Sequence, residues 1–181
     1  MNPEIIATKP RRSRLGSIGE ELAEEALVAT GYQGVRNLND TRPNQPFADI
    51  FAERDGKRYF ISVKTRNESR LGGGLNESYN CFVIADAVNT LLKAQGKSSE
   101  DITQLALAEI ETLALEFAAV PAWITVPVRP DQGTYAVYFG VLSDLGITRS
   151  IPMTPQARSK HLCLVDWATD KRIEAGLTNQ E

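Results

Sequence analysis

Apolar residues recur with helical spacing in two long segments of the chain. One covers residues 15–27 and the other residues 102–117, so two amphipathic helices are predicted. The first is expected to begin at Ser17, because "SIGE" has the pattern of a capping box in which Glu20 reaches back to the start of the helix. Gly31 predicts its end. "SSED" (98–101) predicts the cap of the second helix.

Shorter apolar runs, bounded by turn residues, predict strands. The runs are "YQGVRNL" (32–38), "AWITVPV" (122–128), "TYAVYFGVL" (134–142) and "HLCLVDW" (161–167). Two further runs flank "RDGK" (54–57), and Asp-Gly between strands is typical of a tight hairpin. The resulting order is helix, strand, hairpin, helix, two strands and an appended strand. This order predicts an α/β fold with helices packed on a mixed sheet.

The hairpin would place a small polar group on one face of the predicted sheet. With the Asp-Gly pair at the turn, counting along the strands puts Asp49 opposite Ser62, and alternation puts Lys64 on the same face. One interpretation is a cross-strand ion pair worth about 0.2–1 kcal/mol. The other is a phosphodiester site, in which Asp49 holds a divalent metal and Lys64 positions the attacking water or offsets phosphate charge.

Length and composition narrow the class of protein. A chain of 181 residues suits one full-sized core, so we expect a basic N-terminal arm at 1–14 and a single domain at 15–181. The 42% apolar and 24% charged residues are those of a globular protein and not of a disordered one. Two cysteines and one histidine make neither a disulfide framework nor a zinc site. The sequence has no apolar run long enough to span a bilayer, and its N-terminus lacks the apolar core of a signal peptide. We therefore expect a cytoplasmic protein with no membrane contact.

The net charge of -3 argues against a protein that coats nucleic acid through bulk charge. A nucleic-acid surface would therefore be local. The candidate residues for phosphate contacts are Arg12, Arg14, Arg66 and Arg70.

Three pieces of the sequence, in this order, resemble the PD-(D/E)XK nuclease superfamily. They are "GEELAEEAL" (19–27), "GYQGVRNLN" (31–39) and "ADIFAERDGKRYFISVKTR" (48–66). The layout is most similar to the Holliday-junction-resolvase-like and bacterial predicted-endonuclease groups. The resemblance covers residues 15–66, and residues 100–141 fit in outline. It implies a restriction-endonuclease-like αβββαβ core, with a mixed central sheet flanked by helices.

The resemblance also implies a function and a set of site residues. The protein would be a metal-dependent nuclease that cleaves DNA phosphodiester bonds in repair, recombination or defence, with Mg²⁺ or Mn²⁺ as its cofactor. Glu20, Asp49 and the carbonyl of Val63 would hold the metal, and Lys64 would be the catalytic lysine. Many members of the superfamily work as dimers, so a homodimer is an expectation of the same kind.

One position departs from the superfamily pattern. Ser62 stands where the second acidic residue of the site is usual, and a hydroxyl is a weaker ligand for a hard cation. Ser62 remains a candidate catalytic residue. With a serine at this position, the site can have three forms. The site works with two carboxylates; or Glu77 or Glu21 supplies a displaced one; or the domain is inactive and binds nucleic acid or a protein partner.

Overall fold

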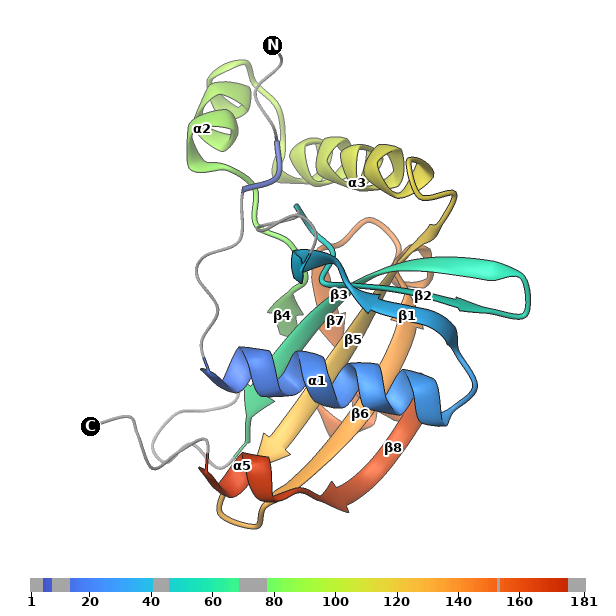
Figure 1. Ribbon diagram of the computed structural model, residues 1–181. Coiled ribbons are helices and arrows are strands. Elements are labelled where there is room, and N and C mark those ends of the chain that lie inside the picture. The colour runs from blue at the N-terminus through green and yellow to red at the C-terminus, as the bar shows by residue number, and fades with distance from the viewer. Residues whose placement is uncertain (1–4, 8–13, 41–45, 69–77, 153, 176–181) are drawn as a thin grey trace.

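A mixed six-stranded sheet forms the centre of the molecule, with the strand order β1-β2-β3-β5-β6-β8 (Figure 1). The computed structural model describes residues 5–7, 14–40, 46–68, 78–152 and 154–175. Neighbouring strands are antiparallel except for the parallel pair β3–β5. The strands are β1 (Gln33–Asn37), β2 (Ile50–Arg54), β3 (Lys57–Asn67), β5 (Val120–Arg129), β6 (Thr134–Val141) and β8 (Leu162–Thr169).

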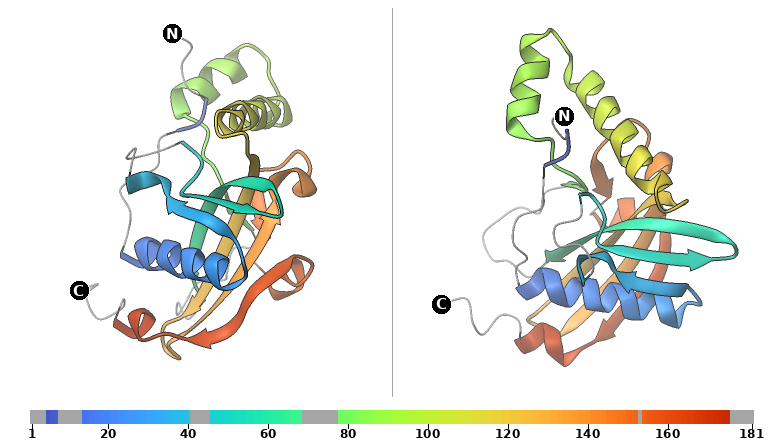
Figure 2. Two further views of the ribbon diagram at one scale, coloured as in Figure 1. Left: turned by 45° about the vertical axis from the view of Figure 1, so that its right-hand side comes forward. Right: turned by 45° about the horizontal axis from the view of Figure 1, so that its top comes forward.

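Helices cover both faces of this sheet. The helix α1 (Arg14–Ala29) crosses one face, and α3 (Ser99–Leu115) lies over the other, beside α2 (Asp86–Ala94) (Figures 1 and 2). The predicted α/β fold with a mixed sheet is therefore confirmed, whereas the restriction-endonuclease-like core stays a prediction. The remaining elements are the short helices η1 (Leu38–Asp40), η2 (Leu142–Leu145), α4 (Pro155–Arg158) and α5 (Lys171–Ala175), and a small sheet of β4 (Ser78–Asn80) and β7 (Ser150–Pro152).

Alternation along β3 divides the core into two layers. Ile61 and Val63 belong to the layer under α1, whereas Phe60 belongs to the layer under α3. The α1 layer contains Ile18, Leu22, Leu27, Ile50 and Ile124, and the α3 layer contains Phe47, Ile102, Ala106, Ile110 and Trp123. Because adjacent residues of β3 point into opposite layers, Ser62 and Lys64 lie on the α3 side.

The hairpin between β2 and β3 forms as predicted. Asp55 and Gly56 have φ angles of 52° and 72°, which is the left-handed conformation that a two-residue type I′ turn requires at both central positions. The pairing then runs from Arg54 opposite Lys57 to Ile50 opposite Ile61. The predicted β2–β3 pairing register, on which the candidate site depends, is therefore confirmed as far as Ile50.

The predicted start of the first helix is wrong. Helix α1 begins at Arg14, so Ser17 lies inside the first turn and Glu20 in the second. A residue inside a helix does not act as its N-cap, because its amide is already within the helical ladder. Its end is confirmed: the helix stops at Ala29 and Gly31 takes a φ of 91°. The second long helix begins as predicted, with a capping box between Ser98 and Asp101.

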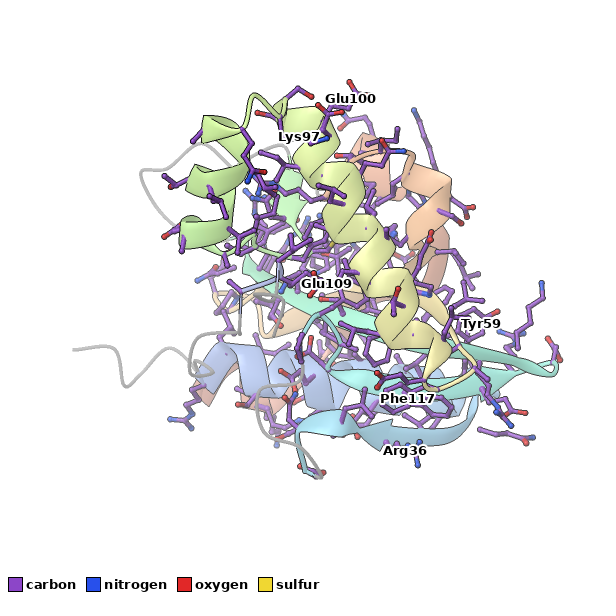
Figure 3. All side chains as sticks on the ribbon, turned by 90° about the horizontal axis from the view of Figure 1, so that it is seen from above. Arg36, Tyr59, Lys97, Glu100, Glu109 and Phe117 are labelled. Atoms are coloured by element: carbon purple, nitrogen blue, oxygen red, sulfur yellow. The ribbon has the colours of Figure 1, made fainter. Side chains whose placement is uncertain are left out.

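Part of the predicted N-terminal arm packs onto the domain. Ile6 pairs with Ile84 and is only 2% exposed. The amide of Ile5 donates to the carboxylate of Glu109, which points from α3 toward this segment, at 3.0 Å (Figure 3). Residues 5–7 are thus anchored to the α2–α3 side of the molecule. Among the described residues, no helix is both long and apolar enough to cross a membrane.

Candidate active site

Asp49 lies immediately before β2, where the β2–β3 ladder ends. Its amide donates to the carbonyl of Ile61 at 2.8 Å, so the regular register stops one residue short of the expected pair with Ser62. The Asp49 carboxylate instead accepts the amide of Val63 at 2.8 Å. Asp49 is 3% exposed. The predicted placement of Asp49 directly opposite Ser62 is therefore wrong in detail, and the carboxylate is fixed against the residue that precedes Lys64.

Glu20 approaches the sheet because the residue before it is a glycine. A Cβ on Gly19 would lie 1.7 Å from Oγ1 of Thr65 on β3, so only a glycine allows α1 to pack this closely. Glu20 follows in the same turn and is 6% exposed. The "GE" pair of the sequence therefore has a physical meaning: the glycine permits close contact with β3, and the glutamate is buried beside it.

Two asparagines connect Glu20 to Asp49. The side-chain amide of Asn37 donates to Glu20 at 3.2 Å and to Glu24 at 3.0 Å. Its oxygen accepts the backbone amide of Asn39 at 3.0 Å, and the Asn39 side chain donates to Asp49 at 3.4 Å. The two carboxylates thus belong to one hydrogen-bonded network. Neither asparagine was predicted as a site residue, although their position at the end of a predicted strand is typical of side chains that bond to nearby backbone.

Lys64 and the backbone of Val63 lie next to this network. In an antiparallel ladder, one residue directs its N–H and its C=O toward the same neighbouring strand. The Val63 amide reaches Asp49, so the Val63 carbonyl also points to the β2 side, beyond the last pair at Ile50. Lys64 follows, half-buried and paired with Thr125 of β5. Glu20 and Asp49 therefore belong to one network at this end of the β2–β3 ladder, the network bonds to the amide of Val63, and Lys64 is the next residue of β3, on its α3 side.

Ser62 is the predicted residue that the structure does not bring into this network. Its side chain is fully buried on the α3 side of β3, and its hydroxyl donates to the carbonyl of Cys81 at 3.1 Å. This bond gives the Ser62 hydroxyl a partner within the apolar α3 layer. The strand alternation that places Ser62 on the same face as Lys64 is confirmed, but the hydroxyl serves the packing of the segment that contains Cys81.

Ser62→Ala is expected to lower the free energy of unfolding by about 1–3 kcal/mol, because the buried hydrogen bond from Ser62 to the carbonyl of Cys81 is lost. Metal binding and any cleavage activity are expected to match those of the unsubstituted protein. Urea unfolding checks the expected loss of stability, and a cleavage assay on the same preparation checks that activity is unchanged. Loss of activity without loss of stability would place Ser62 in the chemistry after all.

The other predicted residues lie on α1, on β3 or outside the described part of the chain. Arg14 is exposed at the start of α1, and Arg66 is 8% exposed on β3. Glu21 contacts Arg172 of α5 at 3.3 Å with 58% of its side chain exposed, so it faces a different surface from Glu20. Arg12, Arg70 and Glu77 lie outside the described residues. The predicted nucleic-acid contacts of the four arginines stay predictions.

Glu68 is the first acidic residue after Lys64 in the sequence, and it takes part in ion pairs. Glu68, just past β3, pairs with Arg158, whose side chain is 2% exposed, and with Arg129 at 3.5 Å. The guanidinium of Arg129 also lies over the ring of Trp167, 3.5 Å from its centroid. The carboxylate of Glu68 offsets the charge of the buried Arg158, and buried charges are usually paired in this way. Glu68 is therefore part of a structural ion-pair cluster.

The possible metal ligands at this site are all oxygen atoms: the carboxylates of Glu20 and Asp49 and the carbonyl of Val63. Oxygen donors suit Mg²⁺, which keeps several of its waters and is commonly held by only one or two carboxylates. In the part of the chain that the structure describes, no group of three or more His, Cys, Asp and Glu side chains could hold a metal ion. The donor set fits a hydrated Mg²⁺ or Mn²⁺ and does not form a closed protein cage.

Two hollows of the described surface lie elsewhere. One of about 360 Å³ lies between α3, β5 and η2, and is lined by Leu107, Pro121 and Ile147 among others. The other, of about 510 Å³, lies between the β1–β2 edge and the end of α3, where Arg36 and Phe117 are seen in Figure 3. Neither is lined by Asp49 or Lys64. These two hollows are therefore separate from the candidate site.

Comparison with known proteins adds no relative. The chain matches no family model, no curated protein and no solved structure at a significant level. The resemblance to PD-(D/E)XK nucleases therefore stays a prediction that rests on the three sequence motifs.

Proposed function

We propose that this protein is a metal-dependent nuclease that cleaves DNA phosphodiester bonds. The observation that carries the proposal is the position of the Asp49 carboxylate, bonded to the amide of Val63, one residue before Lys64. The network through Asn37 and Asn39 ties the same carboxylate to Glu20. Two buried carboxylates from separate segments are thus linked at one end of the β2–β3 ladder, and Lys64 follows the residue whose amide Asp49 accepts.

Each residue has a distinct role in this proposal. Glu20, Asp49 and the Val63 carbonyl would hold Mg²⁺, which when bound lowers the pKa of its water and stabilises charge on the phosphate oxygens. The Lys64 ammonium would offset the negative charge that develops on the phosphate. Lys64 lies in the part of β3 that pairs with β5, opposite Thr125, so it projects from a regular strand of the sheet.

The charge of the chain limits how DNA would bind. The net charge is -3, so attraction to phosphate would come from a local surface and not from the whole molecule. Arg14 is exposed at the start of α1, the helix that carries Glu20, and is the described arginine of the predicted set best placed to contact phosphate. Binding through few such contacts would be weak, and its salt dependence would be shallow because the slope scales with the number of phosphates neutralised.

A cleavage assay on the full chain tests the proposal. Supercoiled plasmid, linear duplex and a four-way junction are each incubated with the protein in Mg²⁺, in Mn²⁺ and in EDTA. We expect cleavage of at least one substrate with metal and none in EDTA. The absence of cleavage with either metal, in a preparation shown to be folded by circular dichroism, would contradict the proposal.

The second candidate is a nuclease-fold domain that binds nucleic acid without cleaving it. It is favoured by Ser62, which leaves the described site with two carboxylates where the superfamily usually has three. This alternative predicts salt-dependent DNA binding that persists in Lys64→Ala, with no turnover in either protein. Fluorescence anisotropy of a labelled duplex at several salt concentrations, run beside the cleavage assay, separates the two candidates.

A further inference from the structure

The orientation of the Asn37 side chain is fixed by hydrogen bonds to its oxygen and from its nitrogen. Its oxygen accepts the amide of Asn39 at 3.0 Å, two residues along the chain, which is an Asx-type turn. The nitrogen must then point the other way, and there it donates to Glu20 and to Glu24 of α1. Asn37 is the last residue of β1, so the strand end determines where the Glu20 carboxylate lies.

Asn39 acts in a similar way on Asp49. Its side-chain amide donates to the Asp49 carboxylate at 3.4 Å, which is the longest bond of the network. The neighbouring amide of Leu38 donates to the Asp49 backbone carbonyl at 2.8 Å. The short segment 37–39 therefore holds both the backbone and the side chain of Asp49, and at its other end it holds Glu20.

The chemistry of an amide suits this position. Glu20 and Glu24 are one helical turn apart and would repel each other, and a shared N–H donor brings them to a common point without neutralising either charge. A lysine or an arginine there would form an ion pair with the carboxylates and compete with a cation. Neutral donors that orient metal-binding carboxylates are common around metal sites and affect metal affinity.

We propose that Asn37 and Asn39 are positioning residues, which fix the Glu20 and Asp49 carboxylates in the geometry that binds a divalent cation. The inference rests on the proposed function, since it concerns the metal of that site. Neither asparagine would touch the metal or the DNA. Their contribution would appear in metal affinity, with little change in the free energy of unfolding beyond the loss of their own side-chain hydrogen bonds.

The experiment measures Mn²⁺ binding to the full chain directly, from the electron paramagnetic resonance signal of unbound Mn²⁺, without DNA. The variants are Asn39→Ala, Asn37→Ala and the conservative Asn39→Gln, which keeps an amide donor. Asn80→Ala, at an exposed position on β4, is the matched control. Urea unfolding of each variant shows which are folded. If Asn37→Ala does not fold, Asn39→Ala decides, because Asn39 lies in the short η1 helix, outside the core.

We expect both alanine variants to weaken Mn²⁺ binding by about 10- to 100-fold. Asn39→Gln should recover part of the affinity, and Asn80→Ala should bind as the unsubstituted protein does. If the unsubstituted protein binds Mn²⁺ and the asparagine variants bind it equally well, the inference is overturned and the proposed function stands. If the unsubstituted protein binds no Mn²⁺, the metal site itself is overturned, and the inference with it.

Discussion

Asp49→Asn is expected to reduce DNA cleavage by at least about 10²–10³-fold, which is the loss seen when one electrostatic contributor to a transition state is removed. The substitution keeps the shape of the side chain, and the remaining carbonyl oxygen still accepts the amide of Val63. The fold should therefore be retained while the negative charge at the end of the ladder is lost. Lys64→Ala should cause a loss of similar size, because the positive charge beside the phosphate is removed.

Two matched controls lie on the same hairpin. Asp55→Asn changes an exposed turn aspartate, and asparagine tolerates its positive φ of 52°. Lys57→Ala changes an exposed lysine at the start of β3. Both should cleave at the unsubstituted rate in the plasmid assay. If Asp49→Asn or Lys64→Ala is folded and as active as these controls, the site assignment is wrong.

Gly19→Ala is expected to destabilise the protein by about 3 kcal/mol, the upper end of the usual cost of overpacking. In an exposed helix, the same change would stabilise by about 1 kcal/mol. Here the new methyl group would lie 1.7 Å from Oγ1 and 2.7 Å from Cβ of Thr65, so α1 would have to move away from β3. Glu20 would move with it, and cleavage should fall as well.

A double-mutant cycle with Thr65→Gly tests the cause of that loss. Removing the Thr65 side chain makes room for the methyl group, so Gly19→Ala should cost much less stability in the Thr65→Gly background. Urea unfolding of the four proteins gives the coupling free energy. Equal costs of Gly19→Ala in the two backgrounds would show that the contact between α1 and β3 is not as close as described.

Local sequence signals predicted those parts of the fold that depend on nearby residues. The turn at Asp55 and Gly56 requires two positive φ angles, and Asp-Gly supplies them, so the β2–β3 register could be counted from the sequence as far as Ile50. The capping box at Ser98 is equally local. The same pattern failed at Ser17, because the helix could continue upstream to Arg14 and the pattern does not report that.

The parts that could not be predicted depend on contacts between distant segments. The Ser62 hydroxyl bonds to the carbonyl of Cys81, which is 19 residues further along the chain. The bonds from Asn37 to Glu20 and from Asn39 to Asp49 join a helix, a strand end and a loop. Alternation correctly gave the face of Ser62 but not its partner, and the partner determines its role.

The pairing of two short strands could not be predicted for a related reason. The strands β4 and β7 have three residues each, and they pair with each other although more than 60 residues separate them in the sequence. Three residues are too few to establish an alternation of apolar and polar positions. Such strands form because tertiary packing brings their edges together, and Ile151 of β7 is fully buried in the α3 layer.

Anomalous diffraction from a crystal soaked in MnCl₂ would decide whether this end of the β2–β3 ladder is a metal site. We predict one Mn²⁺ peak within about 2.0–2.6 Å of a carboxylate oxygen of Asp49, close to the Glu20 carboxylate and the Val63 carbonyl. The same soak of an Asp49→Asn crystal should lose the peak. A well-ordered Asp49 with no anomalous density beside it in the unsubstituted protein, at saturating Mn²⁺, would contradict the proposed nuclease site.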